Sequence, residues 1–414
     1  MRFIRTLFLA TSFLLLSEIA YADTVESGRD LEDQDIQALR DWINTKRQVS
    51  LKEIGGDLSI SGEVRTEFQT AWEDRNGKSQ RGPHSETGRG AQGFDIEVNL
   101  MLDYRTERTW SSIKIEFDND AGVFNGSLGN IALERAYWGV RLVDGEKYNI
   151  DIEAGRRKML TIFDSKVQFS SFFDGIVLRY DHAIEGIGDF YLRTGPFVVN
   201  EQVNQFAYIW EMALLNIANT GVYTKYSIVD WDTKHYAKSF VNDRFRFLVN
   251  QWIVGYRLLI KSINKVMLAY SAFLYNPLAK RLDVSDHKRA NMGGYIGFSL
   301  GQLRKQWDWA LDINYQVVQA QAVPDFDCSG IGLGNANKSG FYTKTLNPVD
   351  GGGASTPANA GGTTNFRGFS ITFDLLLTDK LDIQQMYQQT ITLDSDIGPF
   401  RRFKQYEIEF IYTW

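Results

Sequence analysis

The sequence predicts an all-β protein, a transmembrane antiparallel β-barrel of about 16 strands that follows a short N-terminal helical segment. Three observations support this prediction: repeated segments in which apolar and polar residues alternate, connections that are long and short in turn, and a final alternating strand that ends on an aromatic residue. Aromatic residues make up 14% of the chain while the mean hydropathy is slightly polar, at −0.28. Barrel strands combine these properties because one face is apolar and the other is wet.

Residues 1-22 have the three parts of a secretory signal peptide. Arg2 and Arg5 precede an apolar run from Leu7 to Leu16, and Ala20-Tyr21-Ala22 is a small-x-small cleavage site. The run is too short for a retained transmembrane helix, so cleavage is expected. We therefore expect export from the cytoplasm and a final location in the outer membrane.

Residues 23-55 differ from the rest of the chain because their apolar residues recur at helical spacing. Ile36, Leu39, Trp42 and Ile43 would share one face of a short amphipathic helix. We expect this segment in the periplasm. Three arrangements stay open: self-association, folding into the pore, and a half-ordered leader on the barrel rim.

Residues 56-414 change to a period of two, which is the period of a β-strand, and form the predicted outer-membrane barrel. Phe94 to Tyr104 alternates over about eleven residues, the length that a tilted strand needs to cross a bilayer. Further alternating segments run from Val266 to Leu274, from Trp307 to Val317 and from Phe369 to Leu377. Alternation alone also fits a soluble β-sandwich, but strand length, repetition and the export signal favour the membrane.

Strand starts and their spacing give a count of sixteen, within one hairpin, because the interval from Val198 to Ala218 is irregular. Long polar connections follow odd strands and tight turns follow even ones, as in outer-membrane barrels with both termini in the periplasm. The predicted starts are Leu58, Phe94, Trp110, Ile131, Tyr148, Phe173, Gly188, Phe206, Gly221, Phe247, Lys265, Asn291, Trp307, Asn365, Lys380 and Arg402.

The final strand carries the strongest local signal. Tyr406, Ile408, Phe410, Tyr412 and Trp414 form one apolar face. An alternating last strand with a terminal aromatic residue resembles the signal that barrel-assembly machinery reads in Gram-negative bacteria, so Tyr412 and Trp414 are predicted to carry it. An uncovered apolar edge of this kind would promote aggregation of a soluble protein.

Five motifs make the chain resemble the general-diffusion porins of Gram-negative outer membranes. The resemblance covers the layout of the whole mature chain, although its motifs lie in the first half. It implies a water-filled channel for passive diffusion of ions and small polar solutes, surrounded by outer-membrane lipids, and leaves a homo-oligomer such as a trimer open. The motifs are Leu58-Ser59-Ile60-Ser61-Gly62-Glu63-Val64-Arg65, Glu134-Arg135-Ala136-Tyr137, Ala154-Gly155-Arg156-Arg157-Lys158, Phe163-Asp164-Ser165 and Phe173-Asp174-Gly175-Ile176.

Strand parity assigns charges of opposite sign to different sectors of the inner wall. The loop after the fifth strand is expected to fold inward as in general porins, with Lys158, Asp164 and Lys166 at the constriction. Opposed sectors would make a transverse field, and basic residues beside the loop predict a weak anion preference. Ordinary lumen charges that pair with their neighbours are the alternative explanation. The basic set is Arg135, Arg141, Arg157, Arg179 and Arg193, and the acidic set is Glu63, Glu67, Glu97, Glu116 and Glu407.

The sequence gives little support for other site chemistry. The four histidines are scattered and form no Cys/His cluster with ligand spacing, so neither a metal nor another cofactor is expected. Cys328 is the single cysteine, and it is either a tolerated free thiol or the donor of an intermolecular bond.

Other function classes are less well supported. No nucleophile motif accompanies a histidine base, which argues against an enzyme of the outer-membrane lipase type. A net charge of −6 gives no support for nucleic-acid binding. A structural or adhesive surface barrel that acts through its long loops stays open as the alternative function.

Overall fold

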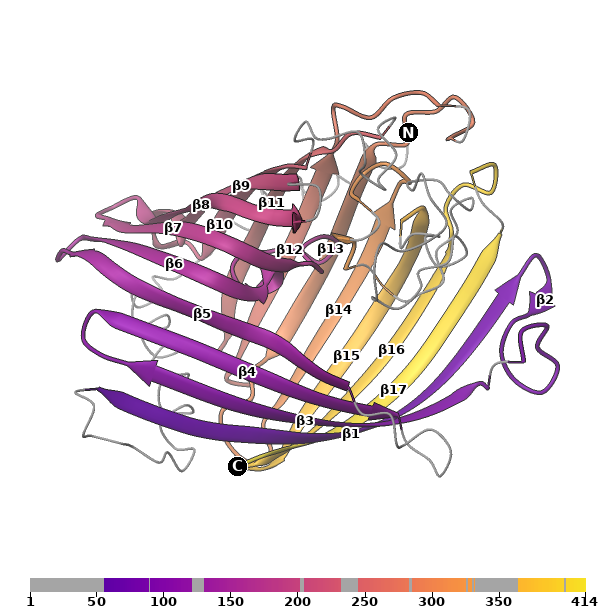
Figure 1. The fold of residues 1–414 in the computed structure, drawn as a ribbon, viewed down its shortest axis with the longest axis horizontal. Coiled ribbons are helices and arrows are strands. Elements are labelled where there is room, and N and C mark those ends of the chain that lie inside the picture. The colour runs from indigo at the N-terminus through magenta and orange to yellow at the C-terminus, as the bar shows by residue number, and fades with distance from the viewer. Residues whose placement is uncertain are drawn as a thin grey trace.

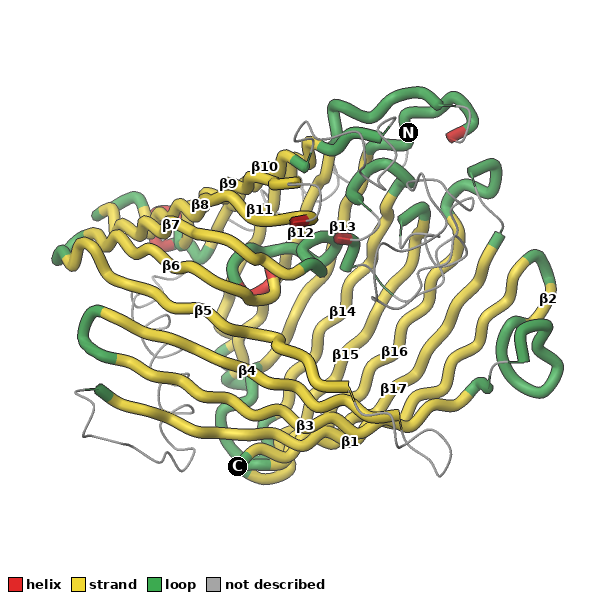
Figure 2. The backbone as a smooth tube through the Cα atoms, viewed as in Figure 1, coloured by secondary structure: helices red, strands yellow, loops and turns green. Residues whose placement is uncertain are grey.

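The computed structural model describes residues 56–88, 90–120, 130–201, 205–231, 245–282, 285–324, 327–329, 331, 364–397 and 400–414. The predicted signal peptide and helical segment lie outside these residues. Within them the chain is mostly β-strand, with a few short helical turns (Figure 2). None of the helices in this part of the chain is long and apolar enough to cross a membrane.

Sixteen long strands of the described chain pair antiparallel with their neighbours and close into a barrel, which confirms the predicted fold class and strand count. The barrel closes because β1 pairs with both β3 and β17, so the first and last strands lie side by side (Figure 1). A two-residue strand, β2 (Lys78–Ser79), folds back on the end of β1. The long strands are β1 (Asp57–Arg75), β3 (Gln92–Arg105), β4 (Thr109–Asp120), β5 (Asn130–Asp144), β6 (Tyr148–Lys158), β7 (Phe172–Ile184), β8 (Gly188–Asn200), β9 (Gln205–Leu215), β10 (Val222–Asp230), β11 (Leu248–Ile260), β12 (Lys265–Tyr275), β13 (Met292–Gly301), β14 (Trp309–Val318), β15 (Phe366–Thr378), β16 (Leu381–Thr392) and β17 (Arg401–Thr413).

The predicted strand starts agree with these bounds to within two residues. Phe94 and Trp307 show the largest departures, two residues each. Trp307 lies in the turn before β14 with a left-handed φ of 68°, so the strand begins at Trp309. The irregular interval 198–218 contains the end of β8 and the whole of β9. Tight turns join the strands at one end of the barrel, the short-turn end, and most connections at the other, the long-loop end, are longer.

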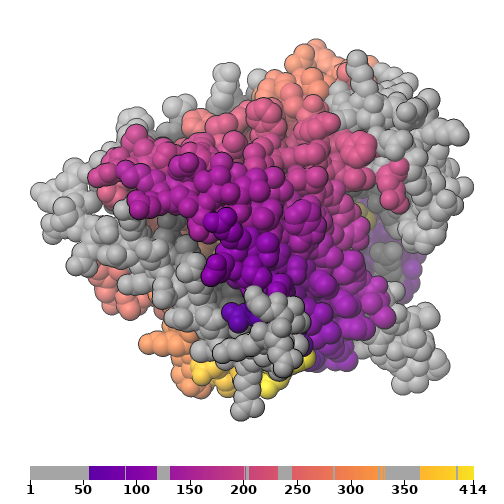
Figure 3. Space-filling view, turned by 60° about the vertical axis from the view of Figure 1, so that its left-hand side comes forward, coloured from indigo at the N-terminus to yellow at the C-terminus, as the bar shows by residue number. Residues whose placement is uncertain are grey.

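Side chains alternate between the outer face of the barrel and its interior, the lumen. In β9, Gln205, Ile209 and Glu211 are buried, whereas the intervening Tyr208 and Trp210 are exposed. The N-terminal strands present a continuous outer surface (Figure 3). Apolar side chains exposed on this face suit a lipid environment. They include Phe68, Trp72, Ile113, Phe117, Trp138, Ile176, Trp252 and Phe410.

The strand β12 turns its apolar face inward. The alternating segment from Val266 to Leu274 is a strand, as expected, but Tyr270, Ala272 and Leu274 are buried inside the barrel. Their partners belong to an apolar core that fills one side of the lumen. A dry interior selects apolar residues on the inner wall, where a wet barrel would select polar ones.

Phenylalanine rings in tilted contact form the centre of this core. Phe163 and Phe169, from the loop after β6, lie 5.6 Å apart between ring centroids. Phe173 on β7 lies 6.0 Å from Phe163 and 5.3 Å from Phe197 on β8. The segment after β14 adds further apolar side chains and the thiol of Cys328, which is buried. Part of the barrel interior is therefore packed like the core of a soluble domain.

The seam between β1 and β17 is closed by a glycine and a tryptophan. The Gly62 N–H donates to the Trp414 carbonyl at 3.2 Å, and the Trp414 N–H donates to the Gly62 carbonyl at 3.0 Å. The indole lies over Gly62 so closely that a Cβ there would come within 2.2 Å of a ring carbon. Only glycine fits this position without displacing the ring.

Candidate functional site

The loop between β6 and β7 turns into the lumen and crosses it. The Asp164 N–H donates to Glu211 on β9 at 3.0 Å, and the Ser165 hydroxyl donates to Gln251 on β11 at 2.7 Å. The Lys166 ammonium lies 3.2 Å from the carboxylate of Asp312 on β14. Polar contacts to β9, β11 and β14 therefore fix the tip of this loop, named the inner loop, to the wall beyond β7.

Residues 327–329, which follow β14, bind the other half of the inner loop and are named the latch. The buried carboxylate of Asp327 accepts the N–H groups of Phe169, at 3.1 Å, and Ser171, at 3.2 Å. The Ser329 N–H donates to the Val167 carbonyl at 2.7 Å. Burial raises the pKa of Asp327 to about 7, even though the two N–H donors act in the opposite direction.

Motifs that carry the porin resemblance meet at the base of the inner loop, in β5, β6 and β7. Lys158 pairs with Glu134 at 2.8 Å, and the Arg157 guanidinium lies 4.4 Å from the centroid of the Tyr137 ring. Opposite Tyr137, Gly155 has a φ of 133°, and a Cβ there would lie 2.2 Å from the Ala136 carbonyl oxygen. The glycine in this motif therefore allows two neighbouring strands to approach closely.

The predicted basic residues Arg157 and Arg179 share one buried carboxylate. Both guanidinium groups donate to Glu153 on β6, Arg179 at 3.0 Å, and the Trp110 indole N–H donates to the same carboxylate at 3.0 Å. Two guanidinium groups thus share one carboxylate, and a second carboxylate, Asp151, lies directly opposite Arg179 in the strand register.

The other three predicted arginines have different surroundings. Arg141 pairs with Asp151 at 3.0 Å near the short-turn end. Arg193 donates to the Ile162 carbonyl of the inner loop, and Arg135 donates to the Ser112 hydroxyl at 3.2 Å. Within the described part of the chain, neither Arg135 nor Arg193 has an ion-pair partner.

The predicted acidic residues on β1 and β3 are grouped around Arg65. Its guanidinium lies 2.6 Å from Glu63 and 3.9 Å from Glu97, and it also reaches Glu409 on β17 at 3.6 Å. On β4, Glu116 pairs with Lys114 at 3.2 Å. Neither cation is among the predicted site residues, although strand parity places each on the same face as the acidic residues of its own strand.

Three carboxylates stand together at the seam. Oxygens of Glu67, Glu407 and Glu409 lie within 4.8 Å of one another, and Glu67 is directly opposite Glu409 in the strand register. Oxygen-only donors are the type that hard cations prefer, whereas the sequence analysis considered only Cys/His ligands. The cluster concentrates negative charge at the seam between β1 and β17.

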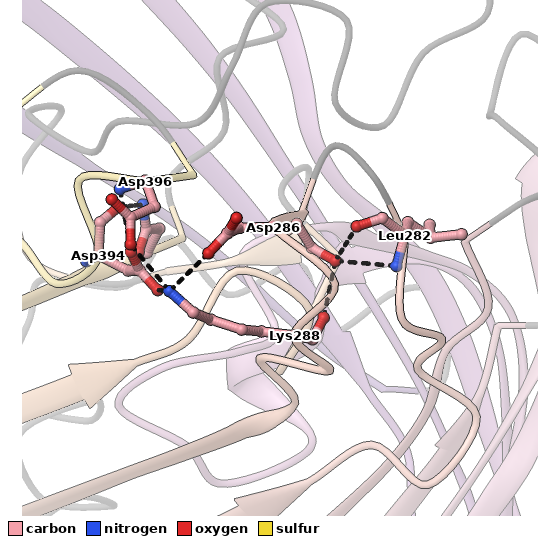
Figure 4. Close-up of polar contacts among 7 residues, drawn as sticks. Leu282, Asp286, Lys288, Asp394 and Asp396 are labelled. Atoms are coloured by element: carbon pink, nitrogen blue, oxygen red, sulfur yellow. Dashed lines mark hydrogen bonds and ion pairs between the residues drawn. The ribbon is translucent and has the colours of Figure 1, made fainter.

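Ion pairs also join two connections at the long-loop end. The Lys288 ammonium lies 2.9 Å from Asp394, 3.0 Å from Asp396 and 3.1 Å from Asp286 (Figure 4). The hydrogen bonds to Asp394, Asp396 and Asp286 raise the lysine's pKa. These contacts tie the connection after β12 to the one after β16.

Two cavities lie beneath the inner loop on the short-turn side and share one ion pair, between Lys225 on β10 and Asp164, at 2.9 Å. The first has a volume of about 530 Å³ and a largely apolar wall from β10, β11 and β12. The second has a volume of about 670 Å³ and a wall that is polar and apolar in nearly equal parts, with Lys147 and Arg193 among its polar residues. Both are large enough for a small organic solute.

No protein-family model and no curated protein sequence matches the chain. Solved structures do match. OprB of Pseudomonas putida aligns with a TM-score of 0.50 and 9% identity over 86% of this chain and 94% of that one. OmpF of Salmonella typhi matches at a TM-score of 0.48 and 13% identity over 88% and 100%, and the outer membrane channel DcaP of Acinetobacter baumannii at 0.47 and 10% over 89% and 99%. With its closed antiparallel barrel of sixteen long strands in the described residues, the chain has the fold of the outer-membrane porins.

Proposed function

We propose that the chain is an outer-membrane channel through which ions and small polar solutes diffuse passively. One observation carries the proposal: a closed barrel has apolar side chains on its outer face and charged side chains in a lumen that a loop crosses. An apolar outer face suits lipid, and a charged lumen suits water. The partners would be outer-membrane lipids, the barrel-assembly machinery and the transported solutes.

We further propose a weak anion preference. A pore senses the charges at its narrowest point, because a field reaches only about 8–10 Å at physiological salt. Arg193 contacts the inner loop directly, and Arg135 stands near the loop's base without a carboxylate partner among the described residues. The acidic residues around Arg65 and at the seam lie on β1, β3 and β17, two strands from Arg135 on β5 and further from Arg193 on β8, so charges of opposite sign would occupy different sectors of the wall beside the solute path.

Planar-bilayer recording tests both statements. Purified protein should give stepwise, unitary conductance, and a KCl gradient should give a reversal potential displaced toward the chloride value. The double variant Arg135→Gln with Arg193→Gln should move the potential toward potassium, and the effect should shrink in 1 M salt, where the screening length falls to about 3 Å. Arg141→Gln is the matched control, because Arg141 already pairs with Asp151.

The outcomes separate the alternatives. A protein that inserts and shows heat-modifiable migration on a gel, yet gives no conductance steps, would overturn the channel and favour the surface-barrel function. A conducting pore whose reversal potential is the same in the double variant and in Arg141→Gln would refute the charge-sector explanation alone.

A further inference from the structure

An apolar wall inside the lumen is the feature that the channel function leaves unexplained. Leu259 on β11 pairs with Val266 on β12, and Leu268 follows on the same face of β12; all three are half-buried and line the 530 Å³ cavity. General diffusion of polar solutes needs a wet, polar wall. Partly exposed apolar groups gathered in a concavity are typical of a binding site.

Glycines flatten the aromatic part of this wall. Tyr223 on β10 is directly opposite Gly255 on β11, and a Cβ at Gly255 would lie within 2.3 Å of the tyrosine ring. The same device recurs at Tyr270, opposite Gly297, where a Cβ would lie 2.6 Å from the phenolic oxygen. The Tyr223 ring is therefore able to lie across the neighbouring strand on the wall of the 530 Å³ cavity, whereas Tyr270 is buried outside that cavity.

Cations stand at the margin of the apolar wall. The Lys225 ammonium lies 5.5 Å from the centroid of Tyr223 and pairs with Asp164 in the roof of the cavity. Arg257, directly opposite Leu268 in the register, lines the same cavity. Two cations and one carboxylate thus line a pocket that is otherwise mostly apolar. The neighbouring 670 Å³ cavity has more carboxylates than cations.

We infer that the 530 Å³ cavity is a solute-binding subsite for small organic anions with an apolar body, such as aromatic monocarboxylates. The carboxylate lies at Lys225 and Arg257, and the body lies on Tyr223, Leu259, Val266 and Leu268. Charge-assisted hydrogen bonds hold the anionic end, and burial of apolar area holds the other. As a step in transport the subsite rests on the proposed channel function, but binding itself does not.

Benzoate is the probe. Acetate is the control that has the carboxylate but no aromatic ring, and benzamide is the control that has the ring but no charge. Binding is measured twice: by calorimetry on the detergent-solubilised protein and by block of single-channel current. Benzoate should release heat and reduce the current, and acetate and benzamide at equal concentration should do neither. Arg257→Gln and Leu268→Asn should each weaken benzoate binding about tenfold, the effect of losing one charged contact or one buried apolar side chain. Lys147→Gln, in the neighbouring cavity, is the matched control.

Each result decides a separate point. Ion conductance without heat or block by benzoate would overturn the subsite and leave the channel intact. Equal weakening by Arg257→Gln and Lys147→Gln would also overturn it, because general attraction of anions would then explain the binding. Binding heat that falls in Arg257→Gln but not in Lys147→Gln, in a protein that does not conduct, would support the subsite and reject the channel.

Discussion

On the β9 to β12 side of the lumen, inner positions hold Ile209, Ile253 and Leu274, whereas on the β1 to β4 side the equivalent positions hold Glu63 and Glu97. The first set is buried against the inner loop, and the second is paired with cations beside open lumen. Burial of apolar area stabilises strongly, while partly exposed ion pairs contribute about 0–1 kcal/mol each. Stability should therefore depend mainly on the filled side, and selectivity mainly on the charged side.

Removing a ring from the filled side should have the largest effect. Phe169→Ala leaves a cavity beside Phe163 and should lower the free energy of unfolding by about 3–5 kcal/mol. Loosening the inner loop should also raise single-channel conductance. Phe68→Ala, on the outer face of β1, is the control and should leave conductance unchanged. An equal fall, in Phe169→Ala and Phe68→Ala, of the temperature at which gel migration changes, with no change in conductance, would contradict the larger role of the filled side.

A charge placed on the outer face tests the orientation of the strands. Phe410→Arg should cost about 2–4 kcal/mol if the residue sits at the bilayer midplane, and less near an interface. Glu409→Gln, one residue away and facing the lumen, should assemble normally. Folding yield into lipid vesicles is the measurement, and equal losses in the two variants would contradict the inside and outside assignments.

The latch at Asp327 should make the filled side sensitive to pH. Burial raises the pKa of this carboxyl to about 7 from 3.8, so the folded protein holds a proton that the unfolded chain releases. Stability should therefore be greatest below about pH 4, decline as pH rises to about 7 and stay level above that. Asp327→Asn should remove this dependence. Thermal inactivation measured from pH 4 to pH 8 checks it, and identical slopes in both proteins would reject the latch.

The ion pairs of Lys288 should have the smallest effect. Because its partners Asp394, Asp396 and Asp286 are partly exposed, Lys288→Gln should cost no more than about 1 kcal/mol. Hydrogen exchange should increase only in the connections after β12 and β16, and 1 M salt should produce the same increase in the unmodified protein. A change in the exchange of β12 itself would show that the contact matters beyond the loops.

Local alternation made the strands predictable, because period two is visible in a single segment such as Phe94 to Tyr104. It could not orient β12, since Val266 to Leu274 reads the same whether its apolar face meets lipid or a dry core. The partner of Arg179 was also not predictable, because Glu153 on β6 meets it only in the register that places β6 beside β7. Arg157 and Glu153, by contrast, lie on the same face of one strand. Strand parity predicts which side chains share a face of the barrel wall, whereas the contacts between residues of neighbouring strands follow only from the register of the closed barrel.

The pairing of Gly62 with Trp414 has a consequence for how the chain folds. The Gln405 side chain donates to Gln69 across this seam, from 336 residues away along the chain. Every other neighbouring pair of long strands can form from adjacent segments, but the seam must bring distant ends together against a large loop-closure entropy. Until it forms, both margins of the sheet offer unpaired N–H and C=O groups to other chains. Folding speed and resistance to aggregation should therefore depend on how fast β1 and β17 come together, with Gly62 and Trp414 at the end of their paired stretch.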